Sequence, residues 1–205
     1  MQRFPMEPLS DDHGFDRGTP LDRRYIETFL EQRQDVLHGA VLEVGDDRYT
    51  RRFGAPSQTT VVDVDRTNPD ATLIADLCDP DSLPAAAFDC IVLAETLHLL
   101  STPAACIANC QRALVTGGSL LLTVPALKRL SPTRPESDYW RFAPAGLELL
   151  FERTWDGPFT IESFGNLRVC LGFLCAQVVE DLNDDDFARN DSRFPLTVAA
   201  HARKP

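Results

Sequence analysis

Short apolar runs alternate with polar or periodic segments along most of the chain. Four of these runs are five to seven residues long and nearly free of charge, as buried parallel strands are. They cover Ala40–Val44, Thr59–Val64, Phe88–Ala94 and Ser119–Val124. Further strands are predicted over 71–75, 159–164 and 195–202, which makes about seven in all.

Helical periodicity lies between the runs. Thr19 and Pro20 open a helix that we expect to reach about Leu37, where His38-Gly39 would stop it. Helices are also predicted over 103–114, 144–152 and 169–180, and the acidic stretch 180–186 is interpreted as a solvated turn. Strands that alternate with helices are typical of an α/β fold, here a doubly wound, Rossmann-like sheet. The polar residues 1–20 are predicted to form an arm or lid, and 21–205 a single domain.

The amino-acid composition and net charge of the chain limit the classes of partner that we expect. The chain has 205 residues, of which 43% are hydrophobic and 25% charged, as in ordinary globular proteins. Twenty basic against 31 acidic residues leave a net charge of −11, which disfavours nucleic acid and anionic membranes as partners. The first fifteen residues carry no targeting signal and no apolar run could span a bilayer, so we expect a cytoplasmic protein.

The six cysteines are interpreted as reduced thiols. Most lie inside apolar segments, where cysteine behaves as a small hydrophobic residue. No CxxC pair occurs, and no cysteine stands beside a histidine at ligand spacing. We therefore expect neither disulfides nor a metal site.

The end of the first strand indicates a nucleoside-binding site. Gly45 follows that strand and Asp65 follows the second, at the spacing of a ribose-binding carboxylate. However, Asp46 and Asp47 place negative charges where the pyrophosphate of a dinucleotide would lie. A cationic cofactor without phosphates suits this turn better, which favours S-adenosylmethionine over a nicotinamide cofactor.

Several motifs in order resemble class I S-adenosylmethionine-dependent methyltransferases, and the chain is similar to their small bacterial type 11 members. It looks closest to a subgroup with an Asp-Arg-Gly-Thr-Pro arm, here 16–20, and a Gly-Asp-Asp-x-Tyr-Thr-Arg-Arg-Phe-Gly loop, here 45–54. The likeness covers about residues 16–155. It rests on these two segments and on Val41-Leu42-Glu43-Val44-Gly45, Asp65, Ala75-Asp76-Leu77, Phe88-Asp89-Cys90-Ile91-Val92-Leu93 and Leu114-Val115-Thr116-Gly117-Gly118.

The resemblance implies a mostly parallel sheet with an antiparallel last strand, and roles for individual residues. Gly45 would let the backbone approach the methionine part of the cofactor, while Glu43 supports the turn. The other implied cofactor contacts are Asp65 to the ribose, Asp76 and Leu77 to the adenine, and Ala94 and Glu95 near the sulfonium.

One feature departs from the family pattern. The usual Gly-x-Gly-x-Gly loop keeps only its first glycine here, so Asp46, Asp47 and Tyr49 would crowd the cofactor unless the loop takes another path.

Candidate catalytic chemistry is sparse, because methyl transfer needs a base only for some nucleophiles. His98 is the candidate base, with a packed structural histidine as the alternative. Tyr139, Trp140 and Arg141 follow the fifth strand and resemble a segment of sugar and natural-product methyltransferases, which implies contact with substrate. The alternative is a loop clamp in which Trp140 and Phe142 fill the core while Arg141 pairs with Asp138. Arg17 in the arm is a candidate partner of the cofactor carboxylate.

The leading hypothesis is a metal-independent S-adenosylmethionine-dependent methyltransferase that acts on a small molecule, at an oxygen of a sugar or secondary metabolite. The alternative is a methyltransferase-fold protein without methyl transfer, serving as a binding subunit or catalysing another reaction. A nicotinamide-dependent reductase is disfavoured by Asp46 and Asp47. The sequence does not determine the oligomeric state, and a homodimer is compatible with it.

Overall fold

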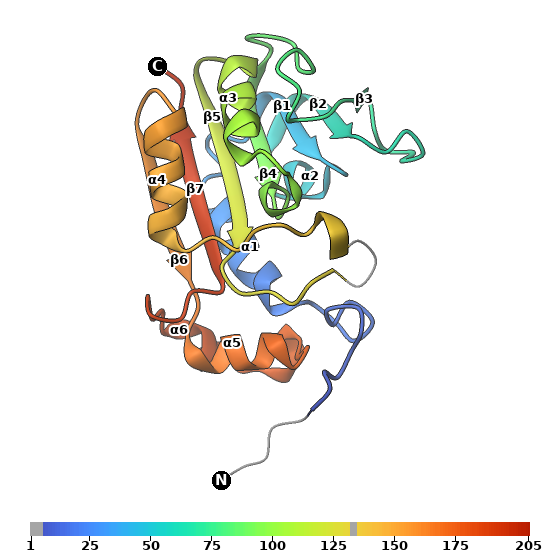
Figure 1. The fold of residues 1–205 in the computed structure, drawn as a ribbon, viewed down its shortest axis with the longest axis vertical. Coiled ribbons are helices and arrows are strands. Elements are labelled where there is room, and N and C mark those ends of the chain that lie inside the picture. The colour runs from blue at the N-terminus through green and yellow to red at the C-terminus, as the bar shows by residue number, and fades with distance from the viewer. Residues whose placement is uncertain (1–5, 132–134) are drawn as a thin grey trace.

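The computed structural model describes residues 6–131 and 135–205. Its seven strands form one sheet in the order β3-β2-β1-β4-β5-β7-β6 (Figure 1). Neighbours are parallel from β3 to β5, and β7 runs antiparallel to both β5 and β6. The predicted fold class is therefore confirmed. The strands are β1 His38–Val44, β2 Ala55–Asp63, β3 Leu73–Ile74, β4 Phe88–Ala94, β5 Leu114–Pro125, β6 Phe159–Phe164 and β7 Thr197–Arg203.

Some strands begin or end at other residues than predicted, because pairing with a neighbouring strand outweighs the local sequence pattern. The third strand shortens to two residues, because only Leu73 and Ile74 pair with β2. The fifth begins at Leu114 rather than Ser119, since its first residue already pairs with Phe88 across an irregularity in the ladder. Conversely, β4 and β6 begin and end at the predicted residues.

The helices cover both faces of this sheet. They are α1 Leu21–Glu31, α2 Arg48–Phe53, α3 Pro103–Ala113, α4 Pro144–Thr154, α5 Leu167–Leu174 and α6 Asp184–Ala188, with 3₁₀ turns at Leu97–Leu99, Pro135–Ser137 and Val179–Asp181. Neither α2 nor α6 was predicted, so the interpretation of the acidic stretch as a plain turn was wrong.

Two predicted helices also end early. The α1 helix stops at Glu31 and continues as hydrogen-bonded turns, because the Leu37 carbonyl accepts from Ala55 and starts the sheet. Likewise α5 stops at Leu174, since Ala176 adopts a left-handed backbone conformation with φ of 58°.

Side-chain alternation along the central strand divides the core into two layers. Ile91 and Leu93 of β4 pack on one face with α3 and α4, and Cys90 and Val92 pack on the other with α1. Figure 1 shows α3 and α4 on the near side of the sheet and α1 on the far side. Because both faces are covered, the strand is apolar at nearly every position.

The described part of the arm packs against the segment that follows α5. The Leu9 amide donates to the Cys175 carbonyl at 2.8 Å, and the Val179 amide donates to Thr19 at 2.8 Å. In Figure 1 this segment and α5 lie beyond the arrowhead of β5, at the same edge as the start of α1. The arm thus borders the edge where the parallel strands end.

All six cysteines are free thiols, as predicted. In the described ranges, every helix is too short or too polar to cross a membrane. The same ranges contain no group of three His, Cys, Asp or Glu side chains that could hold a metal ion.

Replacing a central core residue should test this layering. Leu93→Ala is expected to lower the free energy of unfolding by about 2–5 kcal/mol, because Leu93 is fully buried in β4. Leu149→Ala, on the exposed side of α4, is the matched control, with an expected change within about 0.5 kcal/mol. Equal losses in urea titrations of the two variants would contradict the assigned packing.

Candidate functional site

The strand order reverses direction between β1 and β4. From β1 the chain crosses through α2 to β2, and from β4 it crosses through α3 to β5 on the other face. The loops after β1 and β4 therefore separate and leave a crevice at the carboxyl ends of the strands. In open α/β sheets, ligands bind at this position.

A cavity of about 380 Å³ occupies this position, within the size range of ligand pockets. We call it the first cavity. Its walls are mostly apolar, with Asp63, Thr96 and two serines as polar groups. The lining residues are Val44, Val62, Asp63, Val64, Ala75, Leu77, Thr96, Leu99, Leu100, Ser131 and Ser137.

The loop after β1 avoids this cavity. Gly45 has φ of 82°, and a Cβ built on it would meet no atom within 4 Å, so a ligand can approach the backbone there. Asp46 pairs with Arg48, and Asp47 pairs with Arg51. Tyr49 is buried on the far face of the sheet. The three side chains that the sequence placed in the way of the cofactor therefore point elsewhere.

Glu43 holds the loop in this path. Its carboxylate, 2% exposed, accepts hydrogen bonds from the amides of Tyr49 at 3.1 Å and Thr50 at 2.7 Å. These are free amides of the first turn of α2, where a negative charge is favourable. Burial raises the pKa of Glu43, and the hydrogen bonds oppose that rise. The Glu43 carboxylate thus contacts the loop and does not line the first cavity.

Neutralising this carboxylate should destabilise the loop. Glu43→Gln keeps the shape but turns one acceptor oxygen into a donor that faces an amide, at a cost of about 1–3 kcal/mol. The measurement is the free energy of urea unfolding, with Glu148→Gln on the exposed face of α4 as control. A variant as stable as the control would show that the two amide contacts contribute nothing.

Two acids stand at the carboxyl end of the second strand: Asp63 is its last residue, and Asp65 follows in the loop. Asp63 lines the first cavity, but its oxygens accept from the Asp65 amide and from Asn68, whose side chain also donates to the Gly45 carbonyl. Asp65 is half-buried just beyond the lining and accepts from the amide and hydroxyl of Thr67. Asp63 therefore ties the two loops together.

The proposed adenine contacts differ in burial. Leu77 is 4% exposed and lines the first cavity together with Ala75. Asp76, between them, is exposed and accepts from the Cys78 amide at 2.8 Å. The leucine forms part of the wall, while the carboxylate stands outside it.

A second cavity, of about 260 Å³, adjoins the first, and Leu99 and Ser131 line both. It is more polar and lies between the arm, α1 and the loop after β4. Its lining consists of His13, Phe15, Pro20, Asp22, Arg23, Ala94, Glu95, His98, Leu99, Lys128, Ser131 and Asp138.

Strand β4 ends with Ala94 at this cavity, and Glu95 follows it. Glu95 has φ of 48°, a conformation that costs a non-glycine residue about 1–3 kcal/mol and persists only where the surroundings impose it. Its amide donates to the Thr123 carbonyl at 2.9 Å. One carboxylate oxygen pairs with Lys128 at 3.2 Å, while the other is buried without a partner. Backbone strain and an unpaired oxygen thus coincide at one cavity wall.

His98 is 2% exposed, and its Nδ1 has no hydrogen-bond partner. Burial, reinforced by the charge of Lys128, lowers the pKa of His98 to about 3. The imidazole is therefore neutral at working pH. Its backbone carbonyl accepts from the amides of Tyr139 and Trp140, both at 3.1 Å, which brings that loop to the second cavity.

The neutral state of His98 should appear in the pH dependence of stability. In the unfolded chain His98 binds a proton below pH 6.5, but in the folded chain it does so only near pH 3. The free energy of unfolding therefore falls as the pH drops from 6.5 towards 3, with about 2 kcal/mol lost at pH 5.

Urea titrations at pH 7.5 and 5.0 check this prediction. His98→Gln should lose about 2 kcal/mol less than the unmodified chain between the two pH values. The same pH-dependent loss in both proteins would mean that His98 titrates normally.

Arg141, in the segment after β5, forms a clamp and lines neither cavity. Arg141 binds Asp138 through both carboxylate oxygens and also donates to the carbonyls of Lys128 and Arg129. Trp140 is 43% exposed and donates to the Leu100 carbonyl at 2.8 Å, and Tyr139 is 51% exposed. These contacts match the clamp alternative for Arg141, and Phe142 is buried as that alternative expected. Trp140 does not fill the core, so that part of the alternative was wrong. The rings of Tyr139 and Trp140 are exposed and line neither cavity.

Arg17 lies outside both cavities. It pairs with Asp181 at 3.0 Å and donates to the Ala176 carbonyl, so the guanidinium holds the arm to the segment after α5. We therefore do not keep Arg17 among the proposed cofactor contacts.

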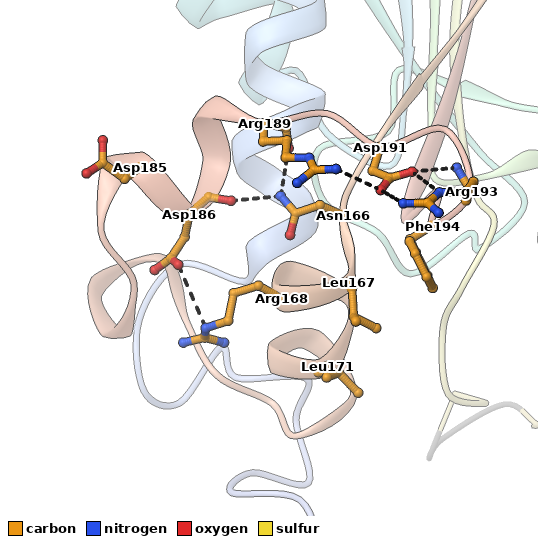
Figure 2. Close-up of a pocket in the computed structure, with 10 residues that line it drawn as sticks. All are labelled: Asn166, Leu167, Arg168, Leu171, Asp185, Asp186, Arg189, Asp191, Arg193 and Phe194. Atoms are coloured by element: carbon orange, nitrogen blue, oxygen red, sulfur yellow. Dashed lines mark hydrogen bonds and ion pairs between the residues drawn. The ribbon is translucent and has the colours of Figure 1, made fainter.

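A larger surface hollow, of about 560 Å³, lies between α5 and α6 (Figure 2). Its charged groups pair with one another: Arg168 with Asp186, and both Arg189 and Arg193 with Asp191. Because its charges are compensated internally and it lies away from the strand switch, we do not regard it as the site.

The comparisons with known proteins agree with this placement. Residues 45–122 match a family described as a methyltransferase domain, type 11. A methyltransferase dependent on S-adenosylmethionine from Archaeoglobus fulgidus is 15% identical, with a TM-score of 0.58 over 89% of this chain and 94% of that one. The chain has the class I methyltransferase fold. The resemblance predicted from the sequence is confirmed.

Other solved structures show how widely this fold is used. The N-methyltransferase NodS from Bradyrhizobium japonicum, solved with S-adenosylhomocysteine, is 17% identical, with a TM-score of 0.58 over 96% of this chain and 94% of that one. The [4+2]-cyclase SpnF is 18% identical, with a TM-score of 0.60 over 92% and 84%. No curated protein sequence matches the chain significantly. These likenesses establish the fold, and the chemistry has to be argued from the site.

Several residues that line the two cavities were not predicted from the sequence. Asp63 could have been found as the last residue of its strand, because ligands bind at the carboxyl ends of the strands in such sheets. Asp22, Leu99 and Lys128 carry no local signal, because they reach the second cavity from separate parts of the chain.

Proposed function

We propose that this protein is an S-adenosylmethionine-dependent methyltransferase that acts on a small molecule and needs no metal ion. The observation that carries the proposal is the pair of adjoining cavities at the strand switch. The first is apolar with a carboxylate at its rim, which suits a nucleoside, and the second is polar and borders the end of β4.

The described residues fit such a cofactor. Gly45 leaves open space above its backbone for the methionine part, and Ala75, Leu77 and Leu100 form an apolar wall for the adenine. Asp65 is proposed to accept from the ribose hydroxyls, because it follows the end of β2 at the spacing of a ribose-binding carboxylate. Asp76 is proposed to accept from the adenine amino group. When bound, the cofactor supplies a methyl group activated by a sulfonium.

The wall of the first cavity argues against a phosphate-bearing cofactor. Among its described lining residues none carries a positive charge, and Asp63 is negative. The pyrophosphate of a nicotinamide dinucleotide would find neither a cation nor a glycine-rich helix start there.

For the acceptor we propose an oxygen of a sugar or secondary metabolite, held in the second cavity. The unpartnered Nδ1 of His98 can accept the hydrogen bond of a hydroxyl. Since the pKa of His98 is about 3, the imidazole is a weak base, and most of its effect would come from orienting that hydroxyl. Tyr139 and Trp140 are proposed to contact the part of the substrate outside the cavity.

The alternative is a protein of this fold without methyl transfer, either a binding subunit or a catalyst of another reaction. The cyclase among the structural neighbours shows that proteins with this fold carry other activities. The intact cavity at the strand switch favours the transferase.

Calorimetric titration with S-adenosylhomocysteine tests the cofactor proposal. We expect saturable binding, and at least tenfold weaker binding by Asp65→Asn, because a carboxylate that accepts from two ribose hydroxyls would be lost. Asp70→Asn, in the same loop and exposed, should bind like the unmodified chain. No binding at millimolar concentration, or binding of a nicotinamide dinucleotide instead, would contradict the proposal.

A further inference from the structure

The second cavity contains more hydrogen-bond acceptors than its own donors satisfy. Asp22, at the start of α1, is 7% exposed, and its Oδ1 has no partner. Glu95, at the end of β4, has an equally buried side chain, and its Oε1 has no partner either. His98 adds the unpartnered Nδ1. Buried polar atoms are normally satisfied, so three unsatisfied ones around a single cavity indicate a missing ligand.

Two cations, Lys128 and Arg23, line the cavity together with the two carboxylates. Burial and the negative charge of Glu95 raise the pKa of Asp22, while the charges of Lys128 and Arg23 oppose that rise. Lys128 pairs with the other oxygen of Glu95. Arg23 donates to the Tyr49 hydroxyl and lies 5.5 Å from the centre of the Phe15 ring. Neither cation supplies a hydrogen bond to the unpaired oxygens, so the wall between Asp22 and Glu95 stays rich in acceptors.

On this basis, and resting on the proposed function, we propose that the second cavity recognises a protonated amine on the acceptor substrate, held between Asp22 and Glu95. An ammonium carries three donors and no acceptor, so it can donate to the unpaired oxygens of both carboxylates at once. A hydroxyl has a single donor and would satisfy only one of the two oxygens. The substrate class is therefore a small amino alcohol or amino sugar, whose hydroxyl faces His98.

The positions of Asp22 and Glu95 explain how an ammonium held between them would select the acceptor substrate. Asp22 comes from α1 and Glu95 from the end of β4, so the ammonium would bridge the arm side and the sheet side of the cavity. Leu99, which is shared by both cavities, separates this point from the apolar nucleoside cavity. The strained backbone of Glu95 fixes its carboxylate at that border.

The probes that test this inference are 3-amino-1-propanol and 1,3-propanediol, which have the same chain length and differ in the amine. Each is titrated into the protein saturated with S-adenosylhomocysteine, and binding is followed by the NMR shifts of the His98 ring. We expect the amino alcohol to bind at least tenfold more tightly than the diol. Asp22→Asn and Glu95→Gln should each reduce that preference to about twofold, and Glu148→Gln should leave it unchanged.

Titration of the same variants with S-adenosylhomocysteine alone separates this inference from the proposed function. We expect Asp22→Asn to bind it within threefold of the unmodified chain, which also shows that this variant is folded. Equal affinity for the two probes, or no binding of either at 50 mM, would overturn the inference while leaving the cofactor proposal intact. A tenfold loss of S-adenosylhomocysteine affinity with the probe preference retained would assign the carboxylates to the amine of the cofactor, which also overturns the inference.

Discussion

The buried carboxylate of Glu43 determines where the chain goes after the first strand. Because it binds the amides of Tyr49 and Thr50, the segment turns at once into α2 on one face of the sheet. Asp46 and Asp47 then pair with arginines of α2 instead of entering the crevice. A loop with one glycine in place of a Gly-x-Gly-x-Gly pattern can therefore still leave the cavity open, with space for close approach above the backbone of Gly45.

The reversal of strand order beside that loop determines where the two cavities lie. Side chains at the ends of β1, β2 and β4 converge there, and the α1 helix brings Asp22 and Arg23 from the arm side. The result is an apolar cavity next to a polar one, with Leu99 and Ser131 shared. Such a division suits the joint binding of a nucleoside cofactor and a small polar acceptor. His98 lines the polar cavity, and burial keeps its imidazole neutral.

The sequence was sufficient for elements whose signal is local. Phe88–Ala94 is apolar throughout and bounded by polar residues, so both ends of β4 could be predicted. The short α2 could not, because six residues become helical through a contact with Glu43 in the preceding strand. The same holds for the cavity walls: Asp22 and Lys128 lie more than 100 residues apart and meet only through the fold. Arg17 was assigned to the cofactor by motif, yet its partner, Asp181, follows α5.

The central claim is that the cavity at the strand switch holds the nucleoside of S-adenosylmethionine. A crystal structure of the protein with S-adenosylhomocysteine tests it most directly. The account requires the adenine against Ala75 and Leu77, the ribose hydroxyls at Asp65, and the sulfur facing the second cavity beside Ala94. Electron density for the nucleoside at any other place, such as the hollow between α5 and α6, would contradict it.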